Sequence, residues 1–200
     1  MGRRTQAERT EATREALIAA ARRLFTERGY EDVGTAEVVR AAGVTRGALY
    51  HHFGDKAALL DAVYARIEAE STERVARVVL GSDLDSPLDA MKAGIEAFLD
   101  ECAQPELRQV ALHDAPAVLG WERWREIGAL NGLGLIEASL AAAIEAGELR
   151  DLPVKPTAHL LMGALDEAAM LLARDERPEG RAEVTEVLVA LLESFAVEPA

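Results

Sequence analysis

The chain has 200 residues and a formal net charge of -13, and half of its residues are hydrophobic, which is enough apolar material for a buried core. No run of about 18 uncharged apolar residues is present and the charged N-terminal residues lack the apolar stretch of a signal peptide, so we expect a cytoplasmic protein with no membrane partner. Cys102 is the only cysteine, which excludes an internal disulfide framework and a cysteine-based metal cluster.

Helical periodicity runs through every long segment, and no segment shows sustained alternation of apolar and polar residues, which predicts an all-α fold. Nine helices are expected, over about residues 7–28, 35–42, 45–52, 56–80, 87–102, 105–113, 121–146, 157–174 and 179–196. Asp55 can cap the fourth helix, and Ser86 followed by Pro87 predicts a strong start for the fifth. Pro116 and Gly120 are expected to interrupt the chain before the seventh.

The segment AAGVTRGALYHHF, residues 41–53, predicts a helix-turn-helix, because two short helices meet there at a glycine. Gly43 supplies the turn position with positive φ that other residues resist, and Thr45 is the expected N-cap of the second helix. On that second helix Leu49 and Phe53, four residues apart, are expected to point inward.

The opposite face of the second helix carries two pairs at i and i+4, Arg46 with Tyr50 and Gly47 with His51. In most proteins, a single residue of any of these types on a helix is an ordinary surface or core residue and does not contact DNA. Their joint presence on one short helix behind a glycine turn, with Lys56 at the next helix start, predicts a surface that contacts DNA.

Charge is distributed unevenly along the chain. Residues 1–56 contain ten Lys and Arg against eight Asp and Glu, whereas the remaining residues contain twelve against twenty-seven. Because binding to a polyanion needs local positive charge, this asymmetry indicates that the N-terminal end meets the polyanion and the acidic remainder does not.

The stretches LIAAARRLFTERGYEDV and TAEVVRAAGVTRGALYHHFGDKAALLDAV, which begin at Leu17 and Thr35, resemble the DNA-binding part of the TetR family of bacterial transcriptional repressors. The resemblance spans about residues 11–60. It implies a three-helix DNA-binding head over residues 8–55 (the family-type domain covers about 11–71) and a helical body over residues 56–200. The body would bind an unknown small-molecule effector and dimerise through the last two helices. A dimer implies that the operator is double-stranded DNA with an inverted repeat. The protein would be released from this DNA when the effector binds.

The resemblance also implies roles for individual residues of the head. Base edges would be contacted by Thr45, Arg46, Gly47 and Ala48, and phosphates by Tyr50, His51 and Lys56. The family usually has Ser or Thr as the cap of the second helix, where this chain has Gly34. The phosphate-contacting hydroxyl is therefore either lost or displaced by one residue, onto Thr35, which is kept as a candidate DNA-binding residue.

Residues 113–134 of the body stand out because they hold both tryptophans, Trp121 and Trp124, on one helical face. Gly128 and Gly132 follow, and each glycine inside a helix costs about 1 kcal/mol relative to alanine, which indicates that a ligand or a neighbouring helix occupies the space beside them. The alternative is that both tryptophans are ordinary packing anchors.

Asp166 and Glu167 interrupt the apolar helix predicted over residues 157–174, and a buried carboxylate is costly unless it is paired. Asp166 could pair with Arg123 or Arg125. It could instead line a cavity with methionine and tryptophan walls, and the effector would then be lipophilic with a cationic or hydrogen-bond-donating group. The candidate effector-binding residues are His113, Trp121, Trp124, Met162 and Asp166; no cofactor or metal ion is expected.

The last two predicted helices carry more apolar residues than one helix pair can hide, which predicts a homodimer closed as a four-helix bundle. The residues that carry this prediction are Leu161, Leu165, Leu172, Val184, Leu188, Leu191 and Phe195.

A transcriptional activator or a constitutive architectural DNA-binding protein fits the same sequence features as a repressor. A competing hypothesis of another class is a helical small-molecule binding protein or enzyme with a vestigial DNA-binding head. His113 and Asp114 would be its acid/base pair. No nucleophile, phosphate loop or carboxylate-bridged metal set accompanies this pair in the sequence, so we expect a protein that is not an enzyme.

Overall fold

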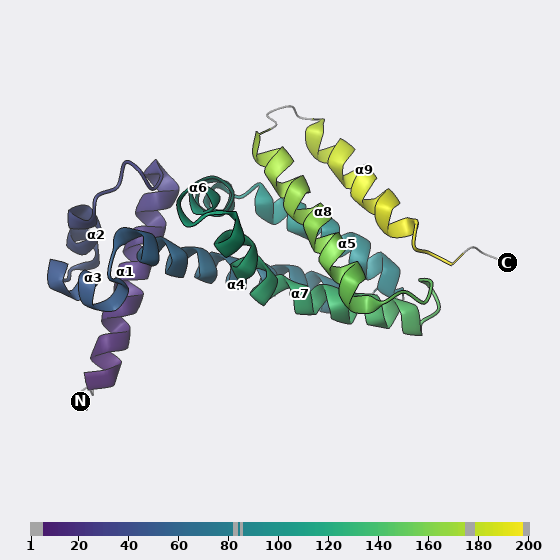
Figure 1. Ribbon diagram of the computed structural model, residues 1–200, viewed down its shortest axis with the longest axis horizontal. Coiled ribbons are helices and arrows are strands. Elements are labelled where there is room, and N and C mark those ends of the chain that lie inside the picture. Colours follow the sequence, from purple (N-terminus) through teal and green to yellow (C-terminus); the bar gives the residue numbers. More distant parts are fainter. Residues whose placement is uncertain (1–5, 82–83, 85, 175–178, 198–200) are drawn as a thin grey trace.

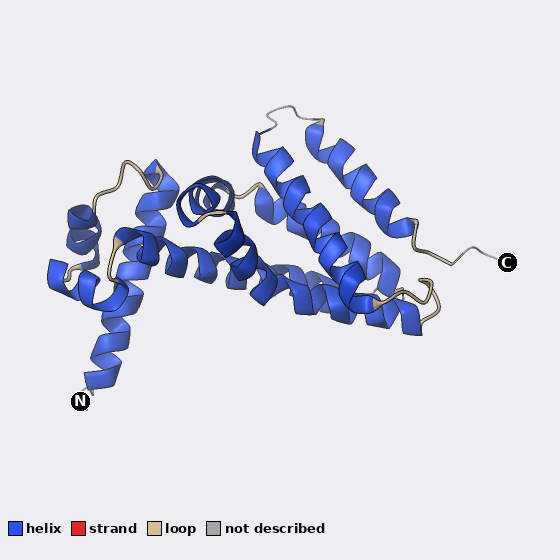
Figure 2. Ribbon diagram, viewed as in Figure 1, coloured by secondary structure: helices blue, strands red, loops and turns tan. Residues whose placement is uncertain are grey.

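A computed structural model describes residues 6–81, 84, 86–174 and 179–197 of the chain. Over these residues the regular secondary structure consists of nine α-helices and one π-helix, and no strand is present (Figure 2). A single isolated bridge joins Leu149 to Ala196. The predicted all-α fold is confirmed.

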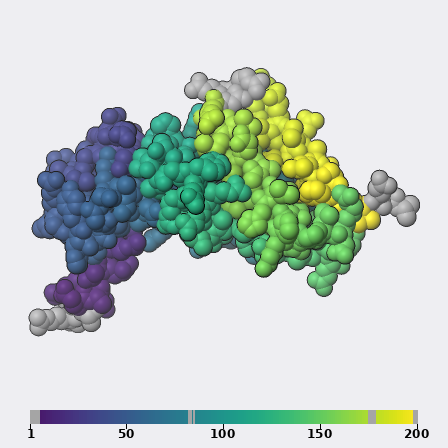
Figure 3. All heavy atoms as spheres, viewed as in Figure 1, coloured from purple at the N-terminus to yellow at the C-terminus, as the bar shows by residue number. Residues whose placement is uncertain are grey.

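The head contains α1 (Gln6–Arg28), α2 (Thr35–Ala42) and α3 (Arg46–Phe53), which lie together at one end of the molecule (Figure 1). Leu17, Phe25, Val38 and Leu49 are fully buried and form the centre of its core. The N-terminal turns of α1 project from the head, as the purple segment of Figure 3 shows.

The turn between α2 and α3 has the geometry expected of a helix-turn-helix. Gly43 ends α2 with φ 67° and ψ 28°, a left-handed conformation that costs other residues about 1–2 kcal/mol. The Thr45 hydroxyl accepts a hydrogen bond from the backbone N–H of Ala48 at 3.3 Å and so caps α3. Gly34 precedes α2 without a side-chain cap, in agreement with the sequence.

Helix α4 (Lys56–Gly81) starts beside α3 and runs from the head into the body (Figure 1). The Asp55 carboxylate accepts a hydrogen bond from the backbone N–H of Ala58 at 2.7 Å, which is the predicted cap. Leu59, Val63 and Ile67 on its inner face are fully buried. The body is therefore joined to the head by one continuous helix.

The rest of the body packs around α4. It comprises α5 (Pro87–Cys102), the π-helix η1 (Leu107–Asp114), α6 (Ala115–Leu119), α7 (Trp121–Glu145), α8 (Val154–Arg174) and α9 (Gly180–Glu193). Helices α5 and α7 contact α4, α8 contacts both α5 and α7, and α9 covers α5 and α8. The arrangement leaves an unfilled space between these helices.

Three predicted boundaries are wrong. Helix α9 ends at Glu193 rather than near residue 196. Pro116 does not interrupt the chain: η1 runs directly into α6 with Pro116 near their junction, and the break comes at Gly120. Helix α8 begins at Val154 rather than near Thr157, since Pro156 lies in its first turn, where the missing N–H removes no hydrogen bond.

The apolar residues of α8 and α9 that face solvent differ from those on which the dimer prediction relied. Leu161 and Leu188 are buried within the protomer, because they face its own core. Other apolar residues of the two helices are exposed: Leu160, Leu171, Val187 and Leu191. Of the original set only Leu191 is exposed.

Helix α7 is the one helix among the described residues that is long and apolar enough, by length and composition, to cross a membrane. The same composition occurs in core helices of soluble proteins. In this fold α7 packs against α4, α5 and α8.

Candidate nucleic-acid interface and effector cavity

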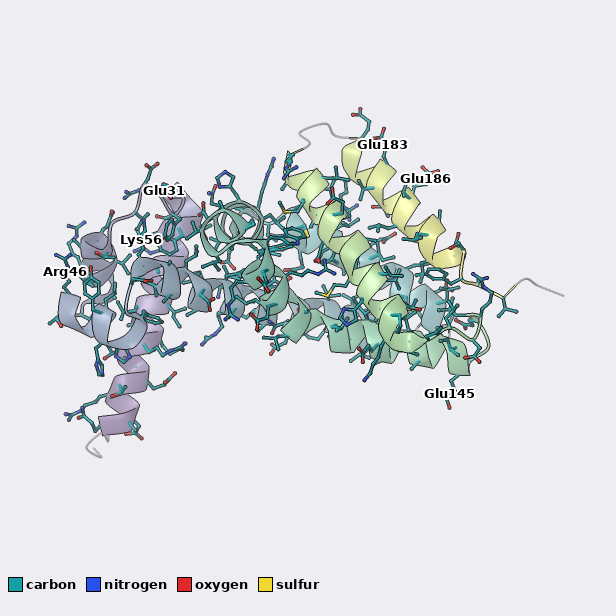
Figure 4. All side chains as sticks on the ribbon, in the orientation of Figure 1. Glu31, Arg46, Lys56, Glu145, Glu183 and Glu186 are labelled. Atoms are coloured by element: carbon teal, nitrogen blue, oxygen red, sulfur yellow. The ribbon has the colours of Figure 1, made fainter. Side chains whose placement is uncertain are left out.

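Helix α3 sorts its side chains by face, as the sequence predicts. Leu49 is fully buried and Phe53 is partly buried, whereas Arg46, Gly47, Tyr50 and His51 are exposed. Figure 4 shows Arg46 at the outer end of the head, with Lys56 nearby. The head thus presents a guanidinium, a phenol and an imidazole to solvent from a helix that its own core holds in place.

Three of the predicted DNA-binding residues are joined by hydrogen bonds. Nη2 of Arg46 donates to the Tyr50 hydroxyl at 3.2 Å, and the guanidinium carbon lies 5.5 Å from the Tyr50 ring centroid. Hydrogen bonds from Arg46 and from Thr35 of α2 lower the pKa of Tyr50. The polar groups on α2 and α3 are therefore aligned before any ligand is present.

The remaining predicted residues lie around this group. Nζ of Lys56 lies 3.8 Å from the Tyr30 ring centroid, a cation–π contact that positions the ammonium at the start of α4. Thr45 and Ala48 lie in the first turn of α3, where free backbone N–H groups favour anions. A Cβ added at Gly47 would meet only the Thr45 hydroxyl, at 3.9 Å, so the surface there is open.

A cavity of about 150 Å³ lies inside the body. Its walls come from α4, α5, η1, α7, α8 and α9, and they are mainly apolar, including Phe98, Leu107, Leu112, Trp124, Met162 and Leu188. An apolar cavity of about this volume in another protein stays dry and binds benzene. The body can therefore hold a compact lipophilic molecule.

Asp166 both lines the cavity and pairs with an arginine, which unites the two alternatives that the sequence left open. Nη1 of Arg125 donates to Oδ2 of Asp166 at 3.0 Å. Burial raises the pKa of Asp166 to about 6, and the charge of Arg125 partly opposes that shift. Arg123 instead pairs with Asp61 of α4, with Nε 2.6 Å from Oδ2.

Met162 and Trp124 line the cavity as predicted, whereas two other candidates do not. The His113 side chain is 76% exposed and its Nδ1 lies 3.1 Å from Oδ1 of Asp114, outside the cavity. Trp121 is half exposed and stacks on the outer side of Trp124, with ring centroids 4.8 Å apart. The last turn of η1 and the first turn of α7 direct these two side chains away from the cavity.

Glu68 is a cavity residue that the sequence reasoning missed. Burial and, to a smaller extent, the nearby Asp166 raise the pKa of Glu68 to about 7, and the adjacent polar Tyr64 hydroxyl opposes them. A signal was present in the sequence: Glu68 lies on the face of α4 that also carries the buried residues Leu60, Tyr64 and Ser71. A carboxylate on an otherwise buried helix face is costly unless it has a partner or a role.

The π-helix η1 connects this cavity to the head, which no sequence signal indicated. Leu107 and Leu112 of η1 line the cavity. On its other side, Asp114 is buried and accepts a hydrogen bond from the backbone N–H of Tyr30 at 2.8 Å, just after α1 ends. Glu106, beside η1, binds the guanidinium of Arg22 in α1 through both oxygens.

Comparison with known proteins identifies both parts of the chain. Residues 17–63 match the family model "Bacterial regulatory proteins, tetR family", and residues 88–195 match "Tetracyclin repressor-like, C-terminal domain". The crystal structure of a TetR-family transcriptional regulator from Pectobacterium atrosepticum is 35% identical, with a TM-score of 0.85, and the match covers 98% of this chain and 100% of that one.

Two relatives known from their sequences match over most of their length. An HTH-type transcriptional regulator of Mycobacterium tuberculosis is 31% identical over 193 residues, which cover 93% of this chain and 88% of that protein. The HTH-type transcriptional repressor AcnR of Corynebacterium glutamicum is 27% identical over 177 residues, which cover 88% of this chain and 90% of that protein.

Proposed function

The chain belongs to the TetR family of bacterial regulatory proteins and is a DNA-binding transcriptional regulator, and on that basis we propose that it represses transcription from an inverted-repeat operator until a small molecule binds in the body. The observation that carries the proposal is the pairing of an exposed polar face on α3 with a mainly apolar cavity in the body. The first suits DNA and the second suits a lipophilic ligand.

The proposed roles in the head follow from where each side chain lies. Thr45, Arg46, Gly47 and Ala48 are on the first turn of α3 or cap it, which is the end of a recognition helix that meets base edges. Phosphates are assigned to the hydroxyls and charges flanking that turn: Thr35, Tyr50, His51 and Lys56. None of these eight residues is buried.

A homodimer through α8 and α9 is supported by the exposed apolar side chains of Leu160 and Leu171 on one helix and Val187 and Leu191 on the other. Leu160 is 75% exposed and Val187 is 68% exposed, which is costly for apolar side chains in water. Two copies would close a four-helix bundle over these residues and present two α3 helices to the DNA. The half-site centres would then lie about 34–36 Å apart or a small multiple of that distance.

Two connections could carry a change from the cavity to the head. Helix α4 contributes Tyr64 and Glu68 to the cavity wall and begins at Lys56 beside α3. The second connection is η1, which contacts the cavity with Leu107 and the end of α1 with Asp114. A ligand that prefers one arrangement of these two elements shifts DNA affinity by no more than its difference in affinity for the two arrangements.

The competing hypothesis of an enzyme has little support. His113 is exposed and its partner Asp114 is engaged by the backbone of Tyr30, so this pair lies outside the cavity in which a substrate would be bound. The relatives that match the chain are transcriptional regulators. We therefore propose a cytoplasmic regulator without catalytic activity.

The test is in vitro selection of duplex DNA from a randomised library by the purified full chain. The expected product is an inverted repeat whose half-site centres lie about 34–36 Å apart or a small multiple of that distance. The affinity of the chain for this duplex should depend strongly on salt concentration. Selection with the Arg46→Ala variant serves as the control and is expected to lose preference at one position in each half-site. Enrichment of no sequence at all, at low salt and micromolar protein, would contradict the proposed function.

A further inference from the structure

The cavity contains two carboxylates, and only one of them has a cationic partner. Asp166 is paired with Arg125. Glu68 lies near the Tyr64 hydroxyl of its own helix, which donates its hydrogen bond to the backbone carbonyl of Trp124 at 3.2 Å. Glu68 forms no ion pair with any Lys, Arg or His in the described part of the chain. The lining beside Glu68 carries the hydroxyls of Ser71 and Thr72 on the same helix, and the more distant walls are mainly apolar, so no protein cation compensates its charge there.

Each helix that faces Glu68 contributes a different group. Helix α4 contributes the Tyr64 hydroxyl, α5 the Cys102 thiol, α7 the Arg125 guanidinium and α8 the Asp166 carboxylate. The parts of η1 and α9 that line the cavity are leucines. Arg125 already neutralises Asp166, so the pocket as a whole is left with one negative charge whenever Glu68 is ionised.

We propose that the cavity selects a lipophilic ligand with one positive charge. The ammonium group of this ligand pairs with Glu68, and its single aromatic or aliphatic ring lies against Trp124 and Met162. The inference rests on the proposed function in one respect, namely that the ligand of this cavity is the effector. The volume of about 150 Å³ limits the ligand to about one ring with a small charged group.

The shape of the cavity supports an elongated ligand that reaches from α4 to α7. Gly132 lines the wall, and a Cβ added there would meet nothing within 4 Å. A Cβ added at Gly128 would lie 3.5 Å from Cε of Met162, in ordinary contact. Open space therefore remains beside Gly132, next to the position proposed for the ring, and a large side chain placed there would extend into the cavity.

Cation binding is coupled to the release of a proton. The ammonium gains most from an ionised carboxylate, and the pKa of Glu68 is raised to about 7, so a large fraction of Glu68 is protonated below neutral pH. Affinity for a permanently charged cation therefore rises as the pH increases from about 6 to about 8 and levels off above that range. A neutral ligand of the same shape shows no such rise.

The test uses two probes of one shape, benzyltrimethylammonium and its neutral isostere neopentylbenzene, titrated into the purified full chain. Binding is followed by calorimetry and by tryptophan fluorescence, because Trp124 lines the cavity and Trp121 stacks on it. Glu68→Gln is expected to weaken binding of the cation by about 30-fold or more and to abolish its pH dependence, because the ammonium loses its buried counter-charge. Binding of the neutral isostere should change by less than about twofold.

Two further variants locate the effect. Glu73→Gln changes an exposed glutamate of the same helix that lies outside the cavity, and it should leave both affinities unchanged. Gly132→Leu fills the open space and should weaken both probes alike. Retained binding of neopentylbenzene by Glu68→Gln shows that the variant is folded.

Tighter binding of the neutral isostere than of the cation would overturn the proposal, as would a cation affinity that Glu68→Gln or Gly132→Leu leaves unchanged. These failures are distinct from failure of the proposed function. If the selected duplex still binds and the neutral probe releases it, the regulator stands and only the ligand class is wrong. If no duplex binds, the cation measurements still decide the chemistry of the cavity.

Discussion

The head and the body of this protein use their interiors in opposite ways. In the head, Leu17, Phe25 and Leu49 fill the core completely, and the residues proposed to act on DNA lie on the outside of one short helix. In the body, helices from distant parts of the chain leave about 150 Å³ unfilled and direct Glu68 and Asp166 into that space. Function in the head depends on which residues face outward, and function in the body on which residues face one another.

This difference has an energetic side. A filled apolar core contributes stability, whereas a cavity forfeits contacts and a buried carboxylate opposes folding when it is ionised. The head is therefore expected to tolerate few core changes, while the body should gain stability from changes that remove its binding groups. Four predictions test this contrast.

The largest effect is expected at Arg46, on the outer face of α3. Arg46→Ala should weaken binding to the selected duplex by about 1–3 kcal/mol per half-site, or about 2–6 kcal/mol for a dimer, if its guanidinium contacts a guanine through two hydrogen bonds. Fluorescence anisotropy with duplexes altered at single positions measures the loss of discrimination.

The matched variant is Lys56→Ala. Because Lys56 is assigned to a phosphate, its removal should weaken all sequences alike and reduce the slope of affinity against salt by about 1 per subunit. A uniform loss for both variants would contradict the division between base contacts and phosphate contacts.

The next effect concerns Glu68 and the stability of the body. The pKa of Glu68 is raised to about 7 in the folded chain, so the folded state holds its proton more tightly than the unfolded state. Glu68 therefore makes the free energy of unfolding fall as the pH rises from about 4.5 to about 7, and Asp166, with a pKa raised to about 6, acts in the same direction.

Glu68→Gln removes the first of these contributions. The variant should be more stable than the parent by up to about 3 kcal/mol at pH 8, since each pKa unit corresponds to about 1.4 kcal/mol, and nearly equal to it at pH 4. Urea unfolding at both pH values measures the difference. Equal stability at both pH values would show that burial of Glu68 costs the fold nothing.

A smaller effect is expected where the body contacts the head. Asp114→Ala leaves the backbone N–H of Tyr30 without its partner and should cost about 1–3 kcal/mol of stability. Hydrogen exchange at the Tyr30 amide should accelerate. His113→Ala is the control, because His113 is exposed beside Asp114, and its effect should stay within about 0.5 kcal/mol. If His113→Ala costs as much as Asp114→Ala, the hydrogen bond to Tyr30 is not what joins the two parts.

The smallest effects come from two glycines of the head that should respond with opposite sign. Gly43→Ala forces a residue with a Cβ into a left-handed conformation and should lower stability by about 1–2 kcal/mol. Gly47→Ala lies within α3 facing open space and should raise stability by about 0.5–1 kcal/mol while weakening DNA binding. Thermal unfolding and duplex titration separate the two outcomes; unchanged DNA affinity for Gly47→Ala would exclude a close approach of DNA at that residue.

The sequence predicted nearly all of the head because its determinants are local. The turn glycine Gly43, the cap Thr45 and the inward Leu49 lie within seven residues of one another, and each acts on its immediate neighbours. The helices of the body were also predicted within a few residues, since apolar periodicity and capping residues such as Ser86 are local as well.

The cavity could be predicted only in part. Trp124, Met162 and Asp166 carried a composition signal within their own helices, but Glu68 and its relation to Asp166 depend on how α4 packs against α8. The exposed positions of His113 and Trp121 follow from the π-helical geometry of η1 and from the start of α7 at Trp121, directly after Gly120. A π-helix is stabilised by packing rather than by local preference, so periodicity could not reveal it.

The central claim is that occupation of the cavity and binding of DNA oppose one another. The most direct measurement is the affinity of benzyltrimethylammonium for the full chain with and without a saturating concentration of the selected duplex, together with the affinity of the duplex with and without the cation. Linkage requires the two affinities to fall by the same factor, and we predict a factor of about 5–150. A cation that quenches Trp124 and binds equally well in the presence of the duplex would contradict the account.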